Sequence, residues 1–130
     1  MWFRRDLRLG DHPALDAAVA RGGPVICAFI HDDSVAKLGA APKWRLGQGL
    51  AALDAALRDK GSRLVLRRGA ALDVLRALVR ETGAGAVHWT RAYDPAARDR
   101  DAAVKAALRR DGVAAHSFPG HLLFEPWTVE

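Results

Sequence analysis

Charged side chains gather directly after the first apolar residues of the chain. The apolar start Met1–Phe3 runs into Arg4–Arg8, where Arg5 and Asp6 are neighbours, and Asp11–Pro13 then has the composition of a helix start. Guanidinium groups and helix N-termini both attract anions, and ligands of open α/β sheets bind beyond the carboxyl ends of strands. The segment therefore predicts a ligand-binding loop, with a solvated charged loop as the alternative.

A second charged segment spans Thr90–Asp101. It contains Tyr93, and the pair Asp94 and Pro95 predicts a helix start with Asp94 as the N-cap. Arg98 and the charged residues after it either contact a ligand or form solvated ion pairs along the helix.

Two further places could supply another wall of the same site. Ile30 and His31 end an apolar run, and Trp44 and Arg45 stand where a helical stretch begins. An indole at a helix start can stack on a planar cofactor, although packing at the sheet edge would explain Trp44 equally well. A lone histidine such as His31 is ordinarily a polar surface residue.

Five short apolar runs alternate with stretches of helical periodicity. The runs are Met1–Phe3, Val25–Ile30, Leu64–Leu66, Ala86–Trp89 and Ala114–Phe118. The clearest helical stripe consists of Leu46, Leu50, Leu53 and Leu57. Glycines follow the helical stretches, at Gly22–Gly23, Gly61, Gly83 and Gly112. The alternation predicts parallel strands joined by right-handed crossovers, and hence a Rossmann-like, doubly wound α/β domain with a parallel five-stranded sheet and helices on both faces.

The composition fits a single globular domain. Hydrophobic residues make up 50% of the 130 residues, which excludes a disordered chain, and no apolar run approaches the roughly 20 residues of a membrane-spanning helix. The one cysteine, Cys27, lies in an apolar run and indicates a cytoplasmic protein. The net charge of +5 permits a nucleic-acid partner without demonstrating one. Because no nucleophile, general base or set of metal ligands is suitably spaced, no catalytic or metal-binding residue is predicted.

The opening segment resembles the N-terminal signature of the DNA photolyase and cryptochrome family. The resemblance rests on Trp2–Leu9 with Asp11, Pro13 and Leu15, on the Tyr93–Pro95 turn before an Arg-Asp-rich helix, and on His121–Pro126. It implies the strand order three-two-one-four-five, with a pocket between the first and fourth strands that holds a light-harvesting antenna chromophore. The residues expected to bind that chromophore are Arg5, Asp6, Ile30, His31, Trp44, Arg45, Tyr93, Asp94 and Arg98.

The sequence departs from the family where folate and deazaflavin antennas are contacted. Ala96–Ala97 stands in place of an Asn-Glu pair, and Ala40 in place of a histidine, both of which are associated with folate. Ala92 stands in place of an acidic residue associated with the deazaflavin, and alanine offers no side-chain hydrogen bond. The resemblance therefore favours an antenna of the flavin mononucleotide (FMN) type, or an empty pocket, over folate or deazaflavin.

The resemblance also implies that residues 1–130 are the N-terminal domain of a longer protein. A helical domain carrying FAD would follow, and the full-length protein would repair UV-damaged DNA with light or act as a photoreceptor. This chain alone would be catalytically inert and would have no membrane partner.

Two other classes of protein share the fold without photochemistry. A free-standing nucleotide-binding module would need a glycine-rich phosphate loop, but Gly10 is isolated, and Gly47 and Gly49 lie within a helical stripe. A docking module would be favoured by an exposed apolar patch near Leu122–Trp127.

Overall fold

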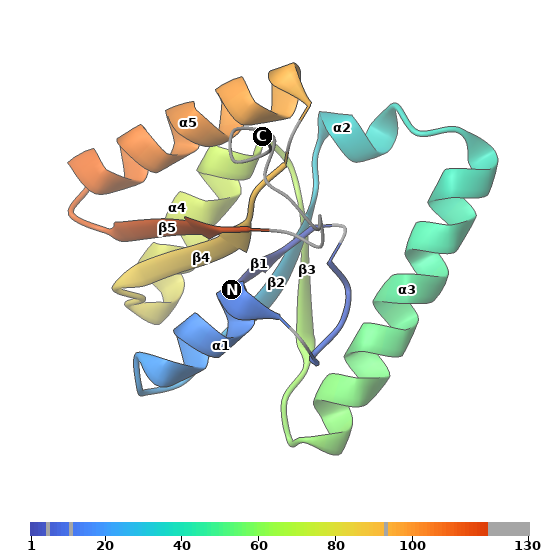
Figure 1. The fold of residues 1–130 in the computed structure, drawn as a ribbon, viewed down its shortest axis with the longest axis horizontal. Helices are drawn as coiled ribbons and strands as arrows, with labels where there is room; N and C mark the ends of the chain where they lie inside the picture. Colours follow the sequence, from blue (N-terminus) through green and yellow to red (C-terminus); the bar gives the residue numbers. More distant parts are fainter. Residues whose placement is uncertain (5, 11, 93, 120–130) are drawn as a thin grey trace, which may run out of the picture.

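The computed structural model describes residues 1–4, 6–10, 12–92 and 94–119. It contains a parallel sheet of five strands in the order β3-β2-β1-β4-β5 (Figure 1). The strands are β1 (Trp2–Phe3), β2 (Cys27–His31), β3 (Leu64–Arg68), β4 (Ala86–Thr90) and β5 (Ala114–Phe118). The predicted doubly wound α/β fold is confirmed, and so is the strand order that the family resemblance implied.

Helices cover both faces of this sheet (Figure 1). They are α1 (Pro13–Ala20), α2 (Asp33–Ala36), α3 (Ala40–Asp59), α4 (Ala71–Thr82) and α5 (Pro95–Arg110). Buried residues of α4 and α5 pack on one face, and buried residues of α1 and α3 pack on the other. None of the helices among the described residues is long and apolar enough to span a membrane.

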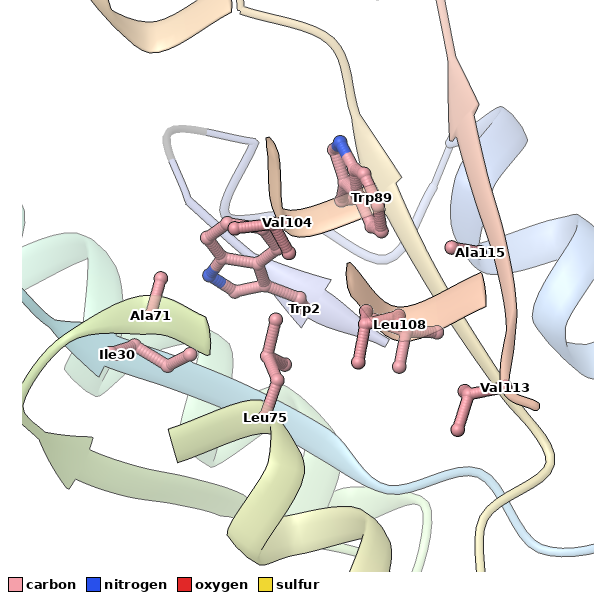
Figure 2. Close-up of a cluster of buried hydrophobic side chains, with 10 residues drawn as sticks. Trp2, Ile30, Ala71, Leu75, Trp89, Val104, Leu108, Val113 and Ala115 are labelled. Atoms are coloured by element: carbon pink, nitrogen blue, oxygen red, sulfur yellow. The ribbon is translucent and has the colours of Figure 1, made fainter. Parts of the chain in front are cut away.

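Strand alternation divides the core into two clusters. Trp2 and Ile30 point toward α4 and α5, where they meet Trp89 (Figure 2). Phe3 and Phe29, one residue away in each strand, belong to the cluster under α1 and α3. The indole rings of Trp2 and Trp89 have centroids 5.5 Å apart, so two of the four tryptophans form the centre of the first cluster.

The sequence patterns locate most elements to within a few residues. The predicted leucine stripe is confirmed, because Leu46, Leu53 and Leu57 are buried under the sheet. The short helix α2 was not predicted; it is capped by Asp32, whose carboxylate accepts a hydrogen bond from the backbone N–H of Ser34. Gly83 ends α4 with a φ of 69°, the left-handed conformation that glycine adopts most readily.

Candidate functional site

The loop between β1 and α1 is organised around the buried carboxylate of Asp6. Only 7% of this residue is exposed. Its Oδ1 accepts a hydrogen bond from the backbone N–H of Arg4 (2.8 Å), and its Oδ2 accepts one from the hydroxyl of Thr90 (2.7 Å). The Nε2 atom of His12 lies 2.7 Å from the same Oδ2. Asp6 therefore ties together the ends of β1 and β4 and the start of α1.

His12 serves this arrangement with both ring nitrogens. It is the N-cap of α1, and its Nδ1 accepts a hydrogen bond from the backbone N–H of Leu15. Because Nδ1 is an acceptor, the neutral ring carries its proton on Nε2, the atom that faces Asp6. Burial alone would raise the pKa of Asp6, but the hydrogen bonds from His12, the Arg4 backbone and Thr90 outweigh burial and lower it to about 2. Asp6 is thus a carboxylate at neutral pH.

A chain of ion pairs lies over the ends of β1 and β2. The Nη1 atom of Arg4 donates to both carboxylate oxygens of Asp101 on α5, at 2.7 and 2.8 Å. Arg100 reaches from α5 to Asp32 (2.9 Å) and lies 3.5 Å from Asp101. The guanidinium of Arg4 stacks 4.8 Å from the centre of the Trp2 ring. We call Arg4, Asp32, Arg100 and Asp101 the switch-point network, because they lie where the strand order reverses between β1 and β4.

A cavity of about 490 Å³ opens beside this network rather than within it. It lies between α5 and the carboxyl ends of β4 and β5. Its lining residues are Trp89, Arg91, Ala92, Pro95, Arg98, Asp99, Asp101, Ala102, Lys105 and Ser117. We refer to it as the α5 cavity. The loop after β4 lines it, as the sequence predicted for a ligand site, whereas no described residue of the loop after β1 is part of its wall.

Four predicted site residues lie near the network or the α5 cavity. Asp6 is held by the backbone of Arg4, by Thr90 and by His12. Ile30 is a core residue packed under α4 and α5. Asp94 caps α5 by accepting a hydrogen bond from the backbone N–H of Ala97 (3.1 Å), which confirms the predicted helix start. Arg98 lines the α5 cavity.

Three further predicted residues lie elsewhere. Trp44 and Arg45 are exposed on α3, across the sheet from α5. His31 is partly exposed and, by alternation with Phe29, points to the α3 side of β2. Trp44, Arg45 and His31 therefore lie on the α3 side of the sheet, whereas Ile30 and Arg98 lie on the α5 side. Arg5, Tyr93 and the segment His121–Trp127 lie outside the described residues.

The sequence placed Arg4, Arg100 and Asp101 in segments expected to bind a ligand, but it did not indicate which ion pairs they form. Arg4 and Asp101 are 97 positions apart, and nothing local indicates that they pair. His12 could have been recognised, because a polar residue directly before a proline at a helix start is the place for an N-cap. Lys105 and Ser117 gave no signal, since the wall they form depends on how α5 lies over β5.

The sequence and the fold both match proteins of one family. The model of the family described as DNA photolyase matches residues 1–130. The chain is 51% identical to a deoxyribodipyrimidine photo-lyase of Agrobacterium fabrum over 126 residues, which are 97% of this chain and 26% of that protein. It is 41% identical to cryptochrome-1 of Arabidopsis thaliana, over 99% of this chain and 19% of that protein.

Solved structures give the same result. A class III photolyase from Agrobacterium tumefaciens superposes with a TM-score of 0.94 at 50% identity, over 99% of this chain and 27% of that one. A photolyase from Sulfolobus tokodaii, solved with two FAD molecules that imply a novel light-harvesting cofactor, superposes with a TM-score of 0.85 at 28% identity, over 99% of this chain and 31% of that one. The chain thus spans about a quarter of the length of such relatives. It belongs to the DNA photolyase family.

Proposed function

We propose that this chain is the antenna domain of a light-driven photolyase, or of a cryptochrome-type photoreceptor. It would hold a planar light-harvesting chromophore beside α3 and pass the excitation energy to FAD on a helical domain of the same protein. The whole protein, acting on UV-damaged DNA, would perform the repair. Family membership, the fold and the Sulfolobus relative described with a second FAD support this proposal.

Trp44 is the observation that carries the proposal. Its side chain is 66% exposed, although tryptophan is usually mostly buried in a folded protein. It projects from the first turns of α3, a helix that Leu53 and Leu57 anchor firmly to the sheet. An exposed, rigidly mounted indole is suited to stacking on a flat conjugated ring.

The surroundings of Trp44 suit an anionic, aromatic ligand. Arg45 is exposed beside it and supplies a guanidinium group. The loop after β1 runs between the sheet and α3 (Figure 1), where Leu7 contacts α3 at Gly49. His31 ends the strand next to β1. In this arrangement Trp44 would stack on the chromophore and orient it, and Arg45 would pair with its charged part.

An antenna of the FMN type fits these residues better than folate or deazaflavin does. The positions that would contact folate are the exposed Ala40 and the pair Ala96–Ala97, and the position associated with deazaflavin is Ala92. None of these side chains can donate or accept a hydrogen bond. A flavin held by stacking and by charge would need none of them. When bound, it would supply absorption of near-UV and blue light.

Binding of chromophores to purified residues 1–130 tests the proposal. FMN, deazaflavin and reduced folate are each titrated in, and uptake is followed by absorption and by quenching of tryptophan fluorescence. We expect uptake of FMN, weakened roughly 2- to 12-fold by Trp44→Ala, the range that loss of an aromatic contact implies. Trp44→Phe should retain most of the affinity. Val19→Ala, which removes another exposed apolar side chain from α1, is the matched control and should bind as the parent does. Absence of uptake, or uptake indifferent to Trp44, would contradict the proposed site.

A further inference from the structure

The α5 cavity contains a buried hydrogen-bond donor that is not used. Trp89 is 1% exposed, yet its indole Nε1–H has no acceptor among the described residues. The ring lines the cavity, and its nitrogen end points away from the hydrophobic cluster that holds the rest of the side chain (Figure 2). Buried N–H groups are nearly always paired in folded proteins, because an unpaired one is costly. The orphaned donor indicates that a ligand atom completes this wall.

Two cationic side chains meet in the same cavity over one hydroxyl group. The Nζ atom of Lys105 lies 3.2 Å from Oγ of Ser117, and Nε of Arg91 lies 3.4 Å from the same oxygen. Burial lowers the pKa of Lys105, and the positive charges of Arg109 and Arg91 lower it further. Two cations that crowd a neutral oxygen form a place where an anion would be stabilised.

Taken together, the charged residues that line the cavity favour binding of an anion. Its lining includes Arg91, Arg98 and Lys105 against two carboxylates, Asp99 and Asp101. Asp101 is already paired with Arg4 and Arg100 of the switch-point network. Among the described lining residues, Asp99 is the carboxylate outside that network. At one end of the cavity, Pro95 and Arg98 belong to the first turn of α5, where the helix dipole is positive.

We propose that the α5 cavity binds a small phosphorylated ligand of nucleotide size. Lys105 and Arg91 would hold the phosphate, and the Nε1–H of Trp89 would donate to a ligand oxygen. The volume of about 490 Å³ lies within the usual range of roughly 300–1,000 Å³ for small-molecule sites. Ala92, Pro95 and Ala102 supply an apolar wall for the rest of the ligand. The cavity lies across the sheet from Trp44, so this site is separate from the proposed antenna site and does not depend on it.

Phosphate groups also occur along the DNA backbone, but the shape of the site favours a free ligand. The donors lie in a hollow between α5 and two strand ends, whereas a DNA backbone usually meets charges spread over an open surface or along a groove. The test below separates the two sources.

Titrations of residues 1–130 at one fixed ionic strength test the proposal, with adenosine 5′-monophosphate and inorganic phosphate as probes. Adenosine, which lacks the phosphate, and a single-stranded oligonucleotide without terminal phosphates are the comparison ligands. Binding is measured by calorimetry and by the NMR signal of the Trp89 indole N–H, assigned with Trp89→Phe. We expect the monophosphate to bind more tightly than adenosine, and the indole signal to shift as binding proceeds.

Lys105→Gln should weaken binding of the monophosphate about 10-fold or more, because it removes a charge-assisted contact. Lys60→Gln makes the same change on the exposed end of α3 and should leave binding unchanged. Since Lys105 is only half-buried, its variant is expected to fold even if Trp89→Phe does not. Equal binding of adenosine, an indole signal that does not move, or indifference to Lys105→Gln would each overturn the proposal. So would Lys105-dependent binding of the oligonucleotide without binding of the monophosphate.

Discussion

Oδ2 of Asp6 and Nε2 of His12 lie 2.7 Å apart inside the protein, and this contact fixes the charged loop after β1. His12 caps α1 with its other nitrogen, so a single imidazole joins the loop to the helix. A buried aspartate thereby anchors the described part of an arginine-rich loop.

Asp6→Asn is expected to destabilise the fold by about 2–4 kcal/mol. An amide has one acceptor oxygen where the carboxylate has two, and its NH₂ group would face the N–H of His12 or the hydroxyl of Thr90. Urea denaturation would give the change in the free energy of unfolding. Asp59→Asn, at the exposed end of α3, should change it by less than about 0.5 kcal/mol. Equal effects of the two variants would show that the Asp6 hydrogen bonds contribute little.

The same carboxylate predicts a loss of stability in acid. The pKa of Asp6 is about 2 in the folded protein against an ordinary value of 3.8. Its contribution is therefore fully present above pH 3.8 and is lost as the pH falls toward 2, by roughly 2 kcal/mol. Measured from pH 5 to pH 2, the free energy of unfolding should fall less steeply in Asp6→Asn than in the parent. Parallel curves for the two proteins would contradict the low pKa.

Local patterns in the sequence were enough to predict the strands, and the family resemblance supplied their order in the sheet. The strand Ala114–Phe118 was located to the residue, because an apolar run between the glycine after a helix and a following proline has little freedom to slip. The stripe Leu46, Leu53 and Leu57 likewise predicted which side of α3 is buried. The strand and the stripe each depend on residues that are close in the sequence.

The site depended on contacts that no local pattern reveals. The crevice at the strand reversal was expected to hold a ligand, but Arg4 and Asp101 pair across it from opposite ends of the chain. The α5 cavity opens toward β5 instead, since its walls are set by how α5 crosses the ends of β4 and β5. Trp89 belonged to a predicted strand. Its N–H is left unpaired only because of how α5, β4 and β5 pack together, which the sequence does not show.

Three neighbouring rings on β4 and β5 predict a second pH dependence of the free energy of unfolding. His88 lies with its ring centre 5.3 Å from that of His116 and 5.8 Å from that of Phe118. Burial lowers the pKa of His88, and the charges of His116, the N-terminus and Arg21 lower it further. Because the folded state favours the neutral ring, this contribution is present above pH 6.5 and is lost as the pH falls below it. NMR titration of His88 in His116→Ala should show its pKa raised toward the ordinary value, and no change would rule out the contact between the two rings as a cause.

Two glycines in α3 offer a matched test of how closely the loop after β1 approaches this helix. A Cβ at Gly47 would meet nothing within 4 Å, whereas a Cβ at Gly49 would lie 2.9 Å from Cδ1 of Leu7. Gly47→Ala should therefore stabilise the protein by about 0.5–1 kcal/mol, the gain expected for alanine over glycine inside a helix. Gly49→Ala should gain less, because Leu7 must move to make room. Urea denaturation compares the two variants directly, and equal gains would mean that the loop is not packed against α3 at this point. If Gly49→Ala also weakens chromophore uptake while Gly47→Ala does not, the contact between Leu7 and α3 supports the site beside Trp44 as well as the fold.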